Sequence, residues 1–440
     1  MRARPSLYIG RALAAALVLG IPAPSRALEV LVSTSFPPRP IGLEEAYQLA
    51  LKRSETLAIS SEAVVQALAQ LDTLWAAAKP TITSNLFQKW ETAIPVQYQP
   101  FSPPSQQSAM FNVKQLVFSG FREILAVQAG RANKRQAIYN RLRAQDLLYQ
   151  SVAAAYYNLW NIQKNVAIDQ EMLKILKDRA RDLSAWVRIG RSRDSDFLAT
   201  DSQRAQTAAQ ISAMGAQEGA AEELMIFLTG VEARFIPRED TYTRPLPLAS
   251  YVDRVPGRPD VRAQKQAVES AAYNLKSSQR QMIPLITFQG NYYPVQPGFL
   301  DVIKWDAGFY ASIPLYTGGQ IAASIRMAHS QLRGAEQNYS LVLRTAIQEA
   351  RTYYGNLVYG LESVRAYVDA EALASKSAEA QMRDYRRGLV TNISVLDSLT
   401  TLQQTRLTLA ASRAQALLSA VQLAVAAGRS TESLPEAKLP

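Results

Sequence analysis

The stretch from Ile303 to Gly428 constrains the fold more than any other part of the chain. Its first eleven residues, Ile303 to Ile313, alternate apolar and polar side chains, which predicts a β-strand with one apolar and one polar face. A strand of that length crosses a lipid bilayer when it is tilted. From Leu343 to Val368 the apolar residues follow heptad spacing, which predicts a long helix that ends near Gly388. The sequence therefore predicts a strand that leads into a long helical hairpin.

The same plan occurs earlier in the chain, displaced by 198 residues. That offset places Gly318 on Gly120 and Tyr354 on Tyr156, and it needs no gap from 116 to 230. Upstream the offset becomes 204, because the loop between the two strands differs by six residues. We interpret this as a tandem duplication in which each copy contains a helix, a strand, a loop, a second strand, a long helix, a turn and a final helix.

The N-terminal segment has the pattern of a secretory signal. Arg2 and Arg4 precede an apolar run from Ala12 to Ile21, and Ser25-Arg26-Ala27 provides a small-x-small cleavage site. The run is too short to span a bilayer as a helix, so we expect residues 1–27 to be removed, with an uncleaved anchor as the alternative. Removing the four arginines of this segment lowers the net charge from +11 to +7.

Composition argues against several classes of protein. The chain has no cysteine, which excludes disulfides, thiolate metal sites and cysteine nucleophiles. His329 is the only histidine, so it makes neither a catalytic triad nor a zinc site. The sequence has no glycine-rich phosphate loop, and its basic residues are spread along helices instead of being clustered. We therefore expect no enzyme activity, no metal or other cofactor, no nucleic-acid partner and no transmembrane helix after the signal.

These patterns divide the mature chain into two repeats, a linker and a tail. Each repeat begins with a shorter helix, at 43–78 or 258–282, and the region 95–107 is a surface loop. The expected boundaries are 28–230 for the first repeat, with strands at about 81–90 and 108–118 and helices at 121–188 and 195–228; 231–257 for the linker; 258–428 for the second repeat, with strands at about 285–293 and 303–313 and helices at 320–387 and 393–427; and 429–440 for a polar tail.

The predicted lengths and strand number require more than one copy of the chain. Each long helix rises roughly 100 Å at about 1.5 Å per residue, and two shorter helices stacked end to end match it. Four strands cannot close a barrel, and open sheet edges do not survive in lipid. Two copies would give eight strands with a filled interior, whereas three would give twelve strands and a lumen. The polar strand faces favour the trimer.

At this point the residues resemble the TolC-type outer-membrane efflux proteins. The resemblance covers about 42–428, and it rests on the order and duplication of the elements together with three local motifs. The motifs are Pro314-Leu315-Tyr316-Thr317-Gly318-Gly319 after a strand, Arg258-Pro259-Asp260-Val261 at a helix start, and Tyr385-x-x-Gly388 followed by Val395-Leu396-Asp397 at the distal turn.

The resemblance implies a mainly α fold with a small β part, assembled as a homotrimer. A twelve-strand barrel in contact with outer-membrane lipid would continue as a twelve-helix periplasmic α-barrel. The implied function is the exit duct of a tripartite efflux or type I secretion system, a passive conduit that works with a periplasmic adaptor and an inner-membrane transporter. The implied location is the outer membrane of a Gram-negative-type bacterium, with a large periplasmic portion. A periplasmic coiled-coil scaffold without a pore is the alternative.

The resemblance also implies a constriction near the helical turns, where acidic rings hold the tunnel shut. Asp397 falls on one acidic position of the family, whereas Ser394 occupies the other. Asp196 is the counterpart of Ser394 in the first repeat, and Asp194 lies beside it. Carboxylates at the start of a helix are also favoured by the backbone dipole, so helix capping is the alternative to gating.

The turn between the two helices of each hairpin contains a glycine beside arginine. Gly190 and Gly388 are expected to adopt a positive φ. The adjacent Arg188, Arg386 and Arg387 are candidates for contact with the adaptor, with solvated surface charge as the alternative.

Aromatic residues occur on or near the predicted strands. Trp90, Tyr292, Tyr293 and Trp305 are candidates for an aromatic girdle at the membrane interface, with ordinary strand packing as the alternative.

Overall fold

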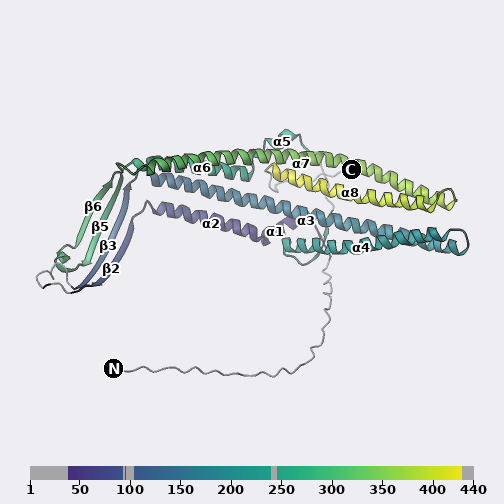
Figure 1. Cartoon of the computed structure of the whole chain (residues 1–440), viewed down its shortest axis with the longest axis horizontal. Helices are drawn as coiled ribbons and strands as arrows, with labels where there is room; N and C mark the ends of the chain where they lie inside the picture. The colour runs from purple at the N-terminus through teal and green to yellow at the C-terminus, as the bar shows by residue number, and fades with distance from the viewer. Residues whose placement is uncertain (1–37, 93–94, 96–103, 239–244, 429–440) are drawn as a thin grey trace, which may run out of the picture.

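The computed structural model describes residues 38–92, 95, 104–238 and 245–428. The predicted signal peptide 1–27 and tail 429–440 lie outside these residues, as does much of the predicted loop 95–107. Figure 1 shows a long, mainly helical molecule with a small sheet at one end and two helical turns at the other, so the predicted mainly α fold with a small β part is confirmed.

The elements follow the order that the sequence predicts for the two halves of the chain. They are β1 (Pro38–Ile41), α1 (Leu43–Arg53), α2 (Glu55–Ala76), β2 (Thr81–Trp90), β3 (Ser105–Phe118), α3 (Arg122–Arg188), α4 (Asp194–Thr229), β4 (Arg234–Pro237), α5 (Leu248–Val252), η2 (Val255–Gly257), α6 (Pro259–Gln279), η3 (Arg280–Met282), β5 (Leu285–Val295), η4 (Gly298–Val302), β6 (Trp305–Ser312), α7 (Gln320–Arg386) and α8 (Asn392–Ala426).

The larger sheet is antiparallel throughout, with the strand order β2-β3-β5-β6. Because side chains alternate between the faces of a strand, the register assigns residues to one face or the other wherever the pairing is regular. Phe288 and Phe309 are paired on one face, which is mostly apolar and is called here the apolar face. Asn291 and Asp306 are paired on the other, which is called here the polar face. Phe309 is 72% exposed in the single chain, so no described part of the chain covers the apolar face at this point.

Three strands differ in length from their predicted bounds. β5 continues to Val295, two residues beyond the predicted end at 293. β6 runs from Trp305 to Ser312, shorter than the predicted 303–313. Its start is lost because the backbone N–H of Ile303 donates to the carbonyl of Leu300 in the preceding turn instead of joining the sheet. β3 begins at Ser105, three residues before the predicted start, because Ser105 still pairs with Trp90 at the end of β2.

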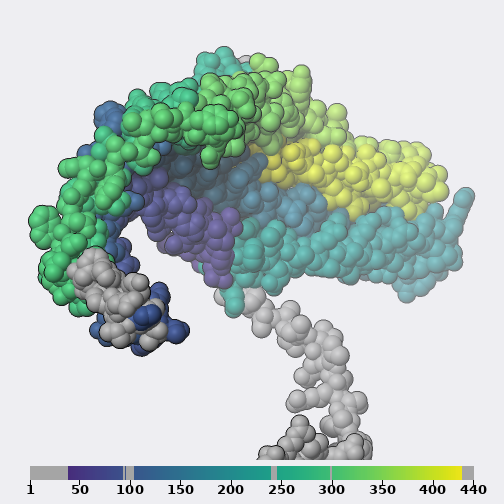
Figure 2. Space-filling model, turned by 60° about the vertical axis from the view of Figure 1, so that its left-hand side comes forward, coloured from purple at the N-terminus to yellow at the C-terminus, as the bar shows by residue number. Residues whose placement is uncertain are grey.

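The helices continue the order of the strands. α3 and α7 each have 67 residues, which corresponds to roughly 100 Å. At the sheet end the contacts run α2 to α3, α3 to α6 and α6 to α7. Further away, α4 packs on α3, and α8 packs on both α7 and α3. Figure 2 shows that these elements form a curved wall with a hollow on one side.

The helix predicted at 43–78 is broken into α1 and α2 at Ser54. Ser54 has an extended backbone, and its side-chain oxygen accepts a hydrogen bond from the backbone N–H of Leu57, 3.2 Å away, which caps α2. The break lets α1 turn toward the middle of the molecule, where Ala46 and Tyr47 are buried.

The largest apolar core lies at mid-height, where α1, α3, α4 and the C-terminal part of α8 meet β4. Tyr156 is fully buried there, and its hydroxyl lies 3.0 Å from the carbonyl oxygens of both Ile41 and Arg238, toward which it donates. α8 has the length and mean hydropathy of a membrane span, 1.3 over its most apolar window, but half of that window is buried. Its apolar character therefore reflects packing against α3 and α7.

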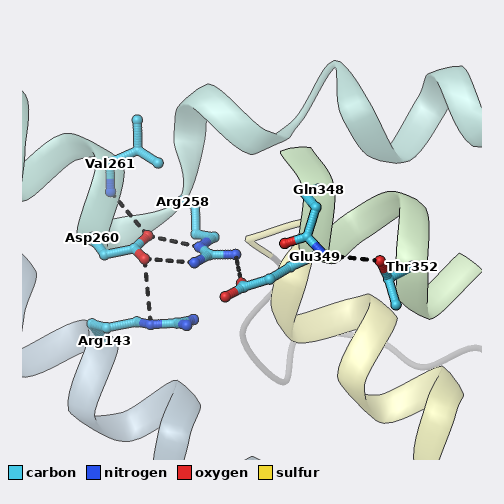
Figure 3. A network of polar contacts seen from close by, with 7 residues as sticks. All are labelled: Arg143, Arg258, Asp260, Val261, Gln348, Glu349 and Thr352. Atoms are coloured by element: carbon cyan, nitrogen blue, oxygen red, sulfur yellow. Dashed lines mark hydrogen bonds and ion pairs between the residues drawn. The ribbon is translucent and has the colours of Figure 1, made fainter. Parts of the chain in front are cut away.

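A buried ion network fixes the start of α6 against two other helices (Figure 3). The Arg258 guanidinium donates to both carboxylate oxygens of Asp260, at 2.7 and 2.6 Å, and to Glu349 of α7 at 2.5 Å. Arg143 of α3 lies 3.6 Å from Asp260. Gly428 passes so close that an added Cβ would lie 3.0 Å from the Arg258 backbone, and its φ is +74°. These contacts join α3, α6, α7 and the end of α8 at one level.

Candidate functional site

The two distal turns adopt the same local conformation. Gly190 and Gly388 have φ values of +69° and +73°, as the sequence predicted. Each glycine N–H and the N–H that follows it bond to carbonyls of the preceding helix turn, which ends α3 and α7 in the same way. An added Cβ at either position would meet no atom within 4 Å, so the backbone conformation alone requires glycine.

Asn392 links the two helical hairpins beside these turns. It is the first residue of α8 and is 1% exposed. Its side-chain oxygen accepts hydrogen bonds from Nε and Nη2 of Arg179 in α3, at 3.1 and 2.6 Å. Its amide nitrogen donates to the carbonyl of Asp196 at 2.9 Å and to the hydroxyl of Thr200 at 3.1 Å, both in α4. One buried amide therefore connects α8 to both helices of the first hairpin.

Tyr385 extends this contact toward the tips. Its ring is stacked with Trp186, with centroids 6.1 Å apart, and the Arg179 guanidinium lies 4.5 Å from the ring centroid. Its hydroxyl shares a hydrogen bond with Ser192, 3.3 Å away. Burial lowers the pKa of Arg179, with Tyr385 and Asp196 acting in the opposite direction. We call Arg179, Asn392 and Tyr385, with their partners, the hairpin contact.

The candidate acidic residues occupy different environments. Asp196 joins the hairpin contact through its backbone carbonyl, and its carboxylate lies 3.4 Å from the Ser192 hydroxyl. Asp397 and Asp194 are exposed. Ser394 forms part of the α8 cap, because its N–H donates to the Thr391 hydroxyl at 3.3 Å. Within one chain, therefore, only Asp196 among the four belongs to the contact between the hairpins.

The candidate arginines lie at the surface of the tips. Arg188, Arg386 and Arg387 are all exposed, beside Gly190 and Gly388. The tip surface is therefore basic, while Asn392 in the hairpin contact just behind it is buried.

The aromatic candidates lie near the loop end of the sheet, far from the helical turns. Trp90, Tyr292 and Trp305 share the apolar face and are 75, 54 and 72% exposed. Tyr293 lies on the polar face, where its side chain forms a hydrogen bond with Asp306. It is therefore on the opposite face from the other three girdle candidates.

Sequence reasoning missed Arg179 and Asn392 entirely. They are 213 residues apart, and neither belongs to a local motif that marks a contact. Tyr385 was noted only as part of the turn motif Tyr385-x-x-Gly388.

Comparison with known proteins agrees with this geometry. Residues 256–429 match the family model described as outer membrane efflux protein. The outer membrane efflux protein BepC of Brucella suis biovar 1 (strain 1330) is 24% identical over 340 residues, which cover 72% of this chain and 71% of BepC.

These matches confirm the resemblance to the outer-membrane efflux proteins that the sequence indicated.

Further similarities support this assignment. The outer membrane protein TolC of Salmonella enteritidis is 30% identical over 125 residues, which cover 28% of this chain and 26% of TolC. The crystal structure of CusC has a TM-score of 0.80 at 17% identity and covers 88% of this chain and 92% of its own. The crystal structure of VceC from Vibrio cholerae has a TM-score of 0.77 at 19% identity. The match covers 88% of this chain and 96% of VceC. The expected location in the outer membrane, with a large periplasmic part, is confirmed.

Proposed function

We propose that three copies of the chain assemble into the exit duct of a tripartite efflux or type I secretion system. The duct is passive, and a periplasmic adaptor and an inner-membrane transporter deliver its cargo. The match of residues 256–429 to the outer membrane efflux protein family model and the shared fold support an efflux role. The homotrimer, the passive mechanism and the partners are our proposals.

The observation that carries the proposal is the direction of the two edge strands. β2 and β6 each pair with a single strand of the described sheet, and the three antiparallel pairings make them run in opposite directions. β6 of one copy is therefore oriented to pair antiparallel with β2 of the next. Because unpaired backbone groups are costly in lipid, such pairing must continue until the sheet closes. Three copies of four strands give twelve and leave a lumen.

The helical layer has the same two edges as the sheet. α2 leads into β2 and α7 follows β6, so the outer helices lie below the outer strands. Both carry exposed apolar side chains, such as Ile59 (70%) in α2 and Met327 (60%) in α7. Burial of such side chains against a neighbouring copy is favourable at about 25 cal/mol per Å². The same neighbours that close the sheet would therefore close a twelve-helix tunnel.

We assign the parts of the chain to this duct as follows. Residues 1–27 are the signal peptide, 28–230 and 258–428 are duplicated strand and helix units, 231–257 link them at mid-height, and 429–440 are a tail. The apolar face contacts lipid, with Trp90, Tyr292 and Trp305 near one interface, and the polar face lines the lumen.

The distal end is the proposed gate. The hairpin contact holds the two hairpins of each chain together, and Asp196, Asp194, Asp397 and Ser394 are candidates for the lining of the constriction. A threefold ring of carboxylates would attract cations. The exposed arginines at positions 188, 386 and 387 form a basic tip that is proposed to contact the adaptor.

The test is reconstitution of the full-length protein purified from outer membranes. We expect a homotrimer by native mass spectrometry in detergent and discrete single-channel steps in a planar bilayer. A soluble monomer that forms no channels would contradict the proposal and would favour the periplasmic scaffold.

A further inference from the structure

We infer that the lumen of the barrel carries two adjacent rings of opposite charge, one of Lys114 and one of Asp306, and that their balance sets the ion preference of the duct. The inference rests on the proposed trimeric channel and adds to it two specificity-determining residues, both far from the distal gate.

Both residues lie on the polar face. Asn112 and Lys114 are two positions apart on β3, in a segment of regular pairing, so they point to the same side. Asn112 pairs with Asn291 on β5, and Asn291 pairs with Asp306 on β6. Lys114 pairs with Gln289, which is two residues nearer the helices than Asn291. The Lys114 ring therefore lies about 7 Å along the strand from the level of Asp306.

Hydrogen bonds across three strands fix the position of the Asp306 carboxylate. The Asn112 amide donates to the side-chain oxygen of Asn291 at 2.6 Å, and the Asn291 amide donates to Asp306 Oδ1 at 2.9 Å. The Tyr293 phenol is another hydrogen-bond partner of Asp306, which gives this aromatic residue a role on the polar face. The negative charge is thus held by neutral groups that leave it uncompensated.

The Lys114 side chain is exposed on the same face. The other charged side chain of the polar face within the described strands is Lys89, which forms an ion pair with Glu91 near the loops. Lys304 lies before β6 and pairs with Asp301 at 2.7 Å. Lys114 and Asp306 are therefore the charges of the sheet interior that no ion pair within 4 Å neutralises among the described residues.

Threefold symmetry converts each residue into a ring at one height. Twelve strands about 4.8 Å apart and tilted by about 45° give a barrel of about 13 Å radius, which places these charges about 10 Å from the axis. At 0.1 M salt, three unit charges at that distance change the ratio of cation to anion permeability by roughly fourfold. With both rings present, their opposite effects on the permeability ratio largely cancel.

The experiment measures reversal potentials of the reconstituted full-length channel in a KCl gradient near 0.1 M. Asp306→Asn retains the size and an acceptor oxygen for Asn291, and it should shift the permeability ratio roughly fourfold toward anions. Lys114→Gln should shift it by a similar factor toward cations, and the double variant should return toward the wild-type ratio. Asp253→Asn, at an exposed position after α5, removes one negative charge outside the sheet and should change nothing.

Both shifts should shrink to less than about 1.3-fold in 1 M salt, because the screening length falls to about 3 Å. Conducting channels whose ratio is unchanged in both single variants, or shifts in the same direction in both, would overturn the inference while leaving the proposed duct intact. Absence of conductance in the wild-type protein would overturn both. If Asp306→Asn does not assemble, Asp306→Ser provides the same charge removal, and assembled trimer is checked for every variant.

Discussion

Replacing Asn392 with alanine should release the contact between the two hairpins and raise the resting conductance of the channel. The variant removes the acceptor for Arg179 and the donor to Asp196 and Thr200, all within 3.1 Å in the wild-type structure. The helix cap is untouched, because the capping side chain belongs to Thr391.

The magnitude follows from the kinds of bonds lost. A hydrogen bond to a charged donor contributes about 1.5–3 kcal/mol and a neutral one about 0.5–1.5 kcal/mol. The two bonds from Arg179 share one acceptor oxygen and are counted as one, and Arg179 keeps its contact with the Tyr385 ring. The low end of the sum therefore applies, and the expected loss is about 2.5–3 kcal/mol per chain. Because about 1.4 kcal/mol corresponds to a factor of ten, the equilibrium between joined and separated hairpins should shift roughly 100-fold.

The assay is the open probability of single channels at low voltage, with Asn356→Ala as the control. Asn356 is exposed on α7, so its loss should leave the open probability unchanged. A double-mutant cycle with Arg179→Met should give strong coupling, since either change breaks the same bonds. Wild-type open probability in Asn392→Ala, or additive effects in the cycle, would refute the role of the hairpin contact.

Three further predictions concern the body and the sheet. Arg258→Met should lower the free energy of unfolding by about 2–3 kcal/mol, because the half-buried carboxylates of Asp260 and Glu349 would lose their hydrogen bonds to the buried guanidinium. Denaturant unfolding measures this, and an equal loss in the exposed control Arg254→Met would contradict it. Burial raises the pKa of Asp146 to about 6, against the opposing effect of Arg143, so protonation of this carboxyl favours the folded state. The stabilisation of the fold by the protonated Asp146 carboxyl is complete below pH about 4 and is lost as pH rises through 6. The unfolding free energy of the wild type, measured relative to Asp146→Asn, should therefore fall by about 3 kcal/mol from pH 4 to 7. A difference between the two proteins that does not depend on pH would be the contrary result. Phe309→Asp should block assembly into the outer membrane, because it places a charge on the proposed lipid face. Wild-type levels of assembly in the membrane would contradict lipid contact by this face.

Much of the fold follows from local patterns in the sequence. The alternation around Phe309 and the heptad spacing along α7 indicate the type of each element, because burial of one face imposes a fixed period. The exact ends depend on individual hydrogen bonds that leave no such period. Ile303 continues the alternation but bonds to Leu300, and Ser54 interrupts a helix in which the apolar spacing runs on without a gap.

The candidate site was less predictable than the fold. The turn glycines were predictable because a positive φ is a local requirement that few residues meet. The bond between Arg179 and Asn392 depends on how two hairpins pack, which no short segment encodes. Tyr293 was grouped with Tyr292 for its aromatic character, whereas the two neighbouring residues lie on opposite faces of the sheet.

The central claim, that separate copies pair their edge strands around one axis, can be tested by cross-linking. The chain has no cysteine, so a pair introduced on the apolar face at Leu86 of β2 and at Ala307, Phe309 or Ala311 of β6 would be the only thiols present. Within one chain these strands are three steps of about 4.8 Å apart, beyond the reach of a disulfide. Oxidation in membranes should therefore give covalent dimers and trimers in at least one register. Monomers at every register, from protein that is folded and oxidisable, would contradict the account.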